Sequence, residues 1–238
     1  MKIRLFTIPN MLTLGNLLCG SAAVVALLAH SNYELAFWLM IASAVCDFFD
    51  GFAARLLKIS SPLGVQLDSL ADMVSFGLVP SVELFCIYDT LPASVELSDT
   101  LSVVLRYLTF IVVAFSALRL AKFNIDDTQH TEFCGLPTPA NGLFCLSLAM
   151  LAAAGDIALT REAVVAVAVV MAFMLISPVR MFALKFKGFG WKGNEIRYIF
   201  ILACVAIVAL FARFAVPAII LLYMAISVVR WAINLRKE

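Results

Sequence analysis

Apolar runs long enough to cross a membrane recur along the chain, and they limit its fold more than any other feature. A transmembrane helix needs about 20 mostly apolar residues. The runs lie at 11–29, 35–57, 65–87, 101–120, 138–155, 163–179, 197–212 and 215–232. Of the 238 residues, 63% are hydrophobic and 14% are charged, which is typical of an integral membrane protein. The sequence therefore predicts an all-α polytopic bundle of about eight transmembrane helices.

The placement of Lys and Arg predicts the orientation of this bundle. With a cytoplasmic N-terminus, only Arg106, Arg161 and Arg213 of the 17 basic residues fall on the opposite side. Both termini are then expected in the cytoplasm. No linker interrupts the runs, so residues 1–238 are expected to form one membrane domain. No basic patch with stacking aromatics indicates a nucleic-acid partner.

Four aspartates stand in this apolar sequence as two closely spaced pairs. Asp47 and Asp50 are three residues apart, and Asp68 and Asp72 are four apart, so each pair lies on one face of its helix. The short segment KISSPLG separates the two helices and predicts antiparallel neighbours. The pairs are then expected to face each other, below the cytoplasmic surface of the membrane.

Carboxylates gathered in a low-dielectric site cannot all remain ionised without cations, and ionisable residues in membrane spans are candidates for function. Oxygen ligands suit Mg²⁺, Mn²⁺ or Ca²⁺, and two divalent ions would balance four charges and act on a phosphate oxygen. The alternative is a helix-pairing network with Arg55, although a single ion pair would serve that purpose. Gly51, Ala54 and Gly64 leave backbone open beside the acids, or serve only to pack helices.

The spacing of these residues resembles the signature of the CDP-alcohol phosphotransferase family. The matching pattern is Asp47-x2-Asp50-Gly51-x2-Ala54-Arg55-x8-Gly64-x3-Asp68-x3-Asp72. The resemblance implies a membrane-embedded homodimer with a six-helix catalytic core, in which a CDP-linked lipid donates its phosphatidyl group to an alcohol and CMP leaves. It implies that the four aspartates hold two Mg²⁺ or Mn²⁺ ions, with Ca²⁺ possible in a crystal. It further implies that Asp72 is the general base.

Residues beside the aspartates are candidates for binding the CDP group. Gly51, Ala54, Arg55 and Gly64 follow from the signature. Asn10 and Thr13, near the start of the first run, either hydrogen-bond the nucleotide or only form the entry of a capped helix.

Four further segments resemble the phosphatidylserine synthase branch of the family. They are IPNMLTLGNLLCG at 8–20, DSLADMVSFGLVP at 68–80, ALRLAKFN at 117–124 and FCGLPTPANG at 133–142. This resemblance implies CDP-diacylglycerol as donor and L-serine as acceptor, in the bacterial inner membrane, with a site open to the cytoplasm. Arg119 and Lys122 are candidates for binding serine or phosphate, although positive-inside anchoring explains such residues equally well.

Two other hypotheses remain open from the sequence. A sibling enzyme of the same family would use another alcohol, glycerol 3-phosphate or inositol phosphate. A cation transporter with an acidic intramembrane site would leave the spacing of the glycines, Ala54 and Arg55 unexplained.

Overall fold

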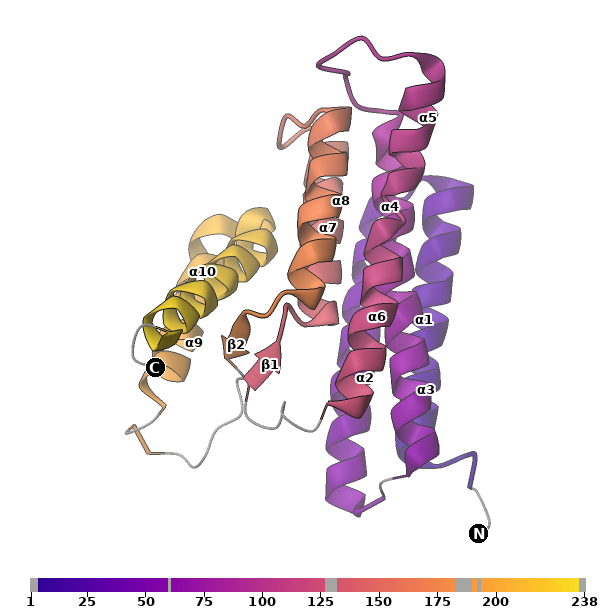
Figure 1. Ribbon diagram of the computed structural model, residues 1–238. Helices are drawn as coiled ribbons and strands as arrows, with labels where there is room; N and C mark the ends of the chain where they lie inside the picture. Colours follow the sequence, from indigo (N-terminus) through magenta and orange to yellow (C-terminus); the bar gives the residue numbers. More distant parts are fainter. Residues whose placement is uncertain (1–3, 60, 127–131, 183–189, 192–193, 236–238) are drawn as a thin grey trace.

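The structure, a computed structural model, describes residues 4–59, 61–126, 132–182, 190–191 and 194–235 (Figure 1). Its helices are α1 (Ile8–His30), α2 (Tyr33–Leu57), α3 (Pro62–Asp72), the π-helix η1 (Met73–Leu78), α4 (Val79–Tyr88), α5 (Asp99–Leu108), α6 (Ile111–Ile125), α7 (Thr138–Ala153), α8 (Arg161–Ile176), α9 (Glu195–Phe211), the 3₁₀ turn η2 (Ala212–Phe214) and α10 (Ala215–Leu235). Two short strands, β1 (Glu132–Cys134) and β2 (Arg180–Phe182), form an antiparallel pair.

Capping residues determine where the first helices begin and end. Thr7, Asn32 and Ser61 each accept a backbone N–H in the first turn of α1, α2 and α3. At the C-terminal ends of α1 and α2, Ser31 and Lys58 adopt left-handed conformations with φ of 47° and 54°. These tight turns make α2 antiparallel to α1 and α3 antiparallel to α2, and α1 packs against both (Figure 1). The short KISSPLG segment predicts the antiparallel arrangement of α2 and α3.

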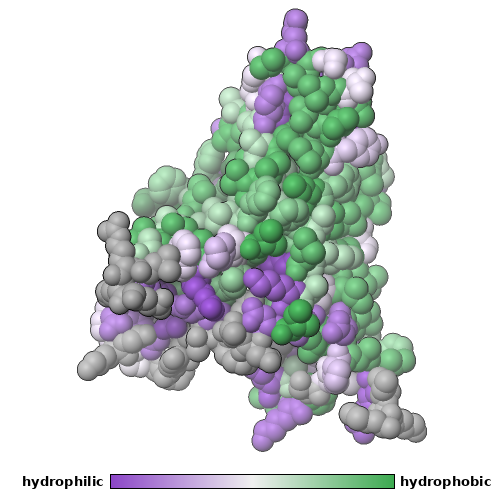
Figure 2. Space-filling model, in the orientation of Figure 1, coloured by the Kyte–Doolittle hydropathy of each residue, from purple (hydrophilic) through white to green (hydrophobic). Residues whose placement is uncertain are grey.

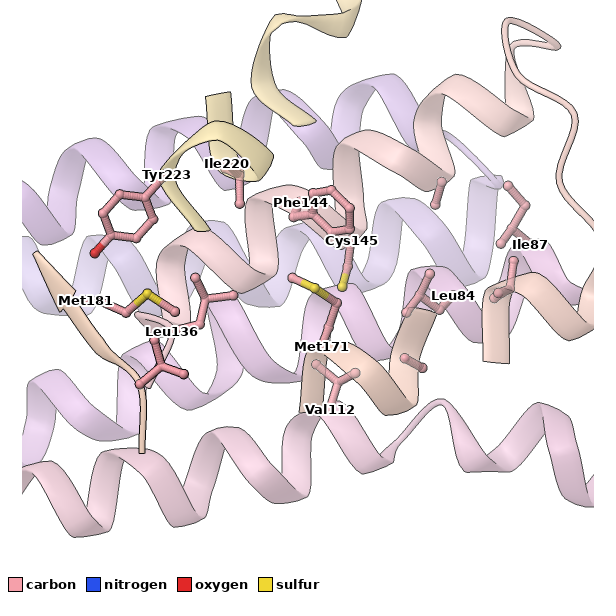
Figure 3. Close-up of a cluster of buried hydrophobic side chains, with 14 of the residues drawn as sticks. Leu84, Ile87, Val112, Leu136, Phe144, Cys145, Met171, Met181, Ile220 and Tyr223 are labelled. Carbon is pink, nitrogen blue, oxygen red and sulfur yellow. The ribbon is translucent and has the colours of Figure 1, made fainter. Parts of the chain in front are cut away.

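Helices α1 to α8 form the main bundle, and α9 and α10 pack together at one side of it (Figure 1). Figure 3 shows a buried apolar cluster in which Leu84 and Ile87 of α4 lie near Phe144 and Cys145 of α7. The same cluster includes Tyr223 of α10, so α10 is packed onto the bundle.

Within the part of the chain that the structure describes, five helical segments are long and apolar enough to cross a membrane. They are Ile8–His30, Tyr33–Leu57, Pro62–Tyr88, Asp99–Ile125 and Glu195–Asn234. Figure 2 shows an apolar face with hydrophilic residues gathered near its two ends. The protein is therefore an all-α integral membrane protein. Each of the eight predicted runs coincides largely with helix, but the number of spans and the orientation of the termini stay predictions.

Two predicted apolar runs are longer than the helices that they form. The run at 138–155 ends as helix at Ala153, because Gly155 takes a left-handed φ of 76°. The run at 163–179 ends as helix at Ile176, because Ser177 precedes Pro178 and is extended. Strand β1 directly precedes α7 and β2 follows α8, and the apolar pattern gave no indication of either strand.

The third predicted run is one long helical segment, Pro62–Tyr88, with a π-helical centre at η1. A π-helix is rare and often occurs at a functional site. Here η1 begins directly after Asp72, the last residue of α3.

Candidate active site

Three carboxylates from two antiparallel helices meet at the candidate site. Asp47 and Asp50 come from α2 and Asp68 comes from α3. One carboxylate oxygen of each lies within 4.8 Å of the other two. The predicted facing of the two helices therefore brings these three side chains together.

Asp72 lies beside this group but outside it. Its side chain is 7% exposed, and its Oδ1 accepts a hydrogen bond of 3.1 Å from Asn16 Nδ2. The carboxylate of Asp47 faces those of both Asp68 and Asp72, which links the two parts of the site.

The donor set fits a hard divalent cation. It consists of carboxylate oxygens alone, which Mg²⁺ and Mn²⁺ prefer. Two ionised carboxylates at 4.8 Å repel by about 3 kcal/mol at an effective dielectric constant of about 20. Bound cations would replace this repulsion with attraction, so Asp47, Asp50 and Asp68 are suited to hold them.

A cleft of about 150 Å³ opens beside the carboxylates. Asp50 and Asp68 form part of its wall, and the remaining lining residues come from α1, α2, α3 and the turn between α2 and α3. Those residues are Pro9, Asn10, Thr13, Gly51, Ala54, Ile59, Ser61, Gly64 and Val65. Five of the six residues predicted to bind CDP are among them. The sixth, Arg55, is exposed and does not line the cleft, although its guanidinium lies near Gly51.

Gly64 lies where the cleft is narrow. A Cβ at this position would be 3.3 Å from Ser61 Oγ and 3.4 Å from Asn10 Oδ1. A larger side chain would therefore occupy the space between α1 and α3. The absence of a side chain keeps this part of the cleft open.

Helix α1 contributes a buried polar face that touches the carboxylates. Thr13 Oγ1 lies 2.6 Å from Asp50 Oδ2, and Asn16 contacts Asp72. The sequence indicates Thr13 as a residue that binds the nucleotide. In the structure its hydroxyl also donates a hydrogen bond to the Asp50 carboxylate. Asn16 was missed by the sequence analysis, although Asn10, Thr13 and Asn16 recur every three residues, which indicates one polar face in an apolar helix.

Arg119 and Lys122 have different surroundings. Arg119 is buried on α6, where its Nη1 donates a 2.9 Å hydrogen bond to Thr138 Oγ1 and its charge is attracted to Asp72. Lys122 is exposed, and its Nζ lies 3.8 Å from Cys134 Sγ. Neither residue lines the cleft, but Arg119 faces the site and Lys122 contacts the β1 strand.

Comparison with known proteins identifies the family of the chain. A family profile described as CDP-alcohol phosphatidyltransferase matches residues 6–177. The chain belongs to this family. The matched region includes α1 to α8, and thus all four aspartates and the cleft, while α9 and α10 lie beyond it.

Three curated relatives carry the same activity name. The CDP-diacylglycerol–serine O-phosphatidyltransferase of Bacillus subtilis is 39% identical over 140 residues, covering 58% of this chain and 72% of the relative. The protein of that name in Helicobacter pylori strain 26695 is 27% identical over 236 residues, covering 95% and 92%. An archaeal protein of that name, from Methanocaldococcus jannaschii, is 30% identical over 148 residues, covering 62% and 63%.

Proposed function

We propose that this protein transfers the phosphatidyl group of CDP-diacylglycerol to L-serine, giving phosphatidylserine and CMP. The observation that carries the proposal is the group of three carboxylates on the wall of a cleft, in a chain of the CDP-alcohol phosphatidyltransferase family. The shared activity name of its relatives favours serine as the acceptor.

In this proposal Asp47, Asp50 and Asp68 hold two divalent cations, Mg²⁺ or Mn²⁺, and Asp72 contributes to the same site. When bound, the cations neutralise the carboxylates and polarise the phosphate oxygens. Asn10, Thr13, Gly51, Ala54 and Gly64 receive the CDP group in the cleft, and Arg55 acts from its edge. Family membership argues against the cation-transporter hypothesis.

Asp72 is proposed as the general base. Its carboxylate takes the proton of the serine hydroxyl while that oxygen attacks the phosphorus atom bonded to the lipid. The phosphorus–oxygen bond to CMP breaks, and CMP leaves with the bonding electron pair. Arg119 supports this arrangement because its buried positive charge, attracted to Asp72, is suited to bind the serine carboxylate. Lys122 is proposed to assist from the surface.

The domain, the membrane topology and the oligomeric state that we propose are those predicted from the sequence. We propose one domain over residues 1–238, about eight spans around a six-helix core, and both termini in the cytoplasm. The site would open to the cytoplasmic face of a bacterial inner membrane, where membrane lipids surround a homodimer.

The test is CMP release by the purified protein in detergent, with CDP-diacylglycerol, Mg²⁺ or Mn²⁺, and one alcohol at a time. We expect release with serine, and a loss of at least about a hundredfold in Asp72→Asn with nucleotide binding retained. Asp99→Asn is the matched control, because it removes an exposed carboxylate at the start of α5. Release with glycerol 3-phosphate or inositol phosphate, but not serine, would assign the protein to a sibling activity.

A further inference from the structure

Helix α1 holds one carboxylate from each aspartate pair. Thr13 contacts Asp50 of α2, and Asn16, one turn later, donates to Asp72 of α3. The proposed base is therefore oriented by a side chain from a helix that contributes no acidic residue to the site.

Asn16 is itself held in one orientation. Ser43 Oγ on α2 lies 2.5 Å from Asn16 Oδ1 and donates to it, since an amide oxygen can only accept. With Oδ1 occupied in this way, the Nδ2 amino group points to Asp72. Asn16 and Ser43 are both 0% exposed, so water does not compete for these bonds. Three helices are thus joined in the order Ser43, Asn16, Asp72.

We propose that Asn16 is a positioning residue for Asp72, and that Ser43 fixes the orientation of the Asn16 amide. The inference rests on the proposed role of Asp72 as base. A donor on Asp72 Oδ1 restrains the carboxylate and leaves Oδ2 as the atom that accepts the serine proton. Without Ser43, the amide can rotate and present its oxygen to the carboxylate, which repels it.

Another serine near Asn16 provides a matched control. Ser75 of η1 is also 0% exposed, and its Oγ donates a 3.1 Å bond to the backbone oxygen of Asn16. Ser75→Ala therefore deletes the same hydroxyl and a bond to the same residue, but leaves the side-chain amide and its two partners in place.

The experiment compares Asn16→Leu, Ser43→Ala and Ser75→Ala with the unaltered protein in the CMP-release assay, together with thermal unfolding in detergent. A hydrogen bond to a charged group predicts a fall in kcat of about tenfold to a hundredfold in Asn16→Leu. We expect a smaller fall in Ser43→Ala and a change of less than about twofold in Ser75→Ala. The KM for CDP-diacylglycerol should stay within about twofold in all three variants.

The double variant Asn16→Leu/Ser43→Ala separates positioning from general stability. If Ser43 acts through Asn16, its substitution should lower kcat in the unaltered protein and have no further effect once Asn16 is replaced. Multiplying effects in the double variant would overturn the inference. So would a kcat of Asn16→Leu or Ser43→Ala equal to that of Ser75→Ala. If Asn16→Leu does not fold, Ser43→Ala against Ser75→Ala decides the question.

Failure of this inference is distinguishable from failure of the proposed function. Release by the unaltered protein with serine tests the function alone. If another alcohol proves to be the acceptor, the same variants are compared with that alcohol, because the Ser43–Asn16 chain acts on Asp72 and not on the acceptor.

Discussion

The close packing of α7 against η1 makes Gly142 sensitive to substitution. Gly142 of α7 packs against the backbone of Phe76, four residues after Asp72. A Cβ on Gly142 would lie 2.9 Å from the Phe76 carbonyl oxygen and 3.1 Å from its Cα. Because these are backbone atoms in a buried π-helix, they cannot move aside as a flexible side chain would. Gly142→Ala should therefore separate α7 from η1.

Gly15 of α1 is the matched control for this substitution. A Cβ there would lie 3.4 Å from Cys46 Sγ, which is an ordinary contact. Both changes gain about 1 kcal/mol from the helix propensity of Ala. Only Gly142→Ala also overpacks its surroundings, which lowers the free energy of unfolding by about 1–3 kcal/mol. The free energies of unfolding of the two variants should therefore differ by about 1–3 kcal/mol.

The assay is thermal unfolding of both variants in the same detergent. For a chain of this length, about 1 kcal/mol corresponds to roughly 2–4 °C in Tm, so Gly142→Ala should melt several degrees below Gly15→Ala. It should also release CMP more slowly, because a displaced η1 shifts Asp72. Equal melting temperatures would refute the close approach of α7 to η1.

Three further predictions concern the site. Asp47→Ala removes one of the clustered carboxylates, so the Mg²⁺ or Mn²⁺ concentration for half-maximal CMP release should rise at least about tenfold; an unchanged requirement would contradict its role as a ligand. Arg119→Gln should raise the KM for serine about tenfold or more, with that for CDP-diacylglycerol nearly unchanged; a parallel rise in both would favour a structural role. Gly64→Val fills the cleft beside Asn10, so the KM for CDP-diacylglycerol should rise about fivefold to a hundredfold. Gly190→Val, in open space, is its control, and equal values for the two would show that the cleft does not bind the donor.

The helices were predictable because lipid imposes a simple rule on sequence. Each of the eight apolar runs coincides largely with helix, and the capping residues Thr7, Asn32 and Ser61 stand directly before the helices that they begin. The π-helical centre at η1 was not predictable in the same way. Its residues, MVSFGL, are as apolar as the α-helical segments beside them, so hydropathy does not distinguish the two.

The site was partly predictable for a related reason. Spacings of three and four residues place Asp47 with Asp50 and Asp68 with Asp72 on helix faces, and a short turn makes the faces meet. The contribution of α1 depends instead on how three helices pack. The sequence marks Asn16 as a polar residue in an apolar helix, but its bonds to Ser43 and Asp72 connect residues 27 and 56 positions away.

The π-helix makes the winding of residues 73–78 as important as their composition. Because α3, η1 and α4 form one continuous helical segment, each residue of η1 adds to the rotation between the aspartates and the face of α4 that packs in the core. An α-helix turns by about 100° per residue, and the wider i→i+5 turns of a π-helix turn by less, so rewinding 73–78 as α-helix would rotate Asp68 and Asp72 relative to α4. The aspartates would then point away from α2, even though every residue of the signature was still present.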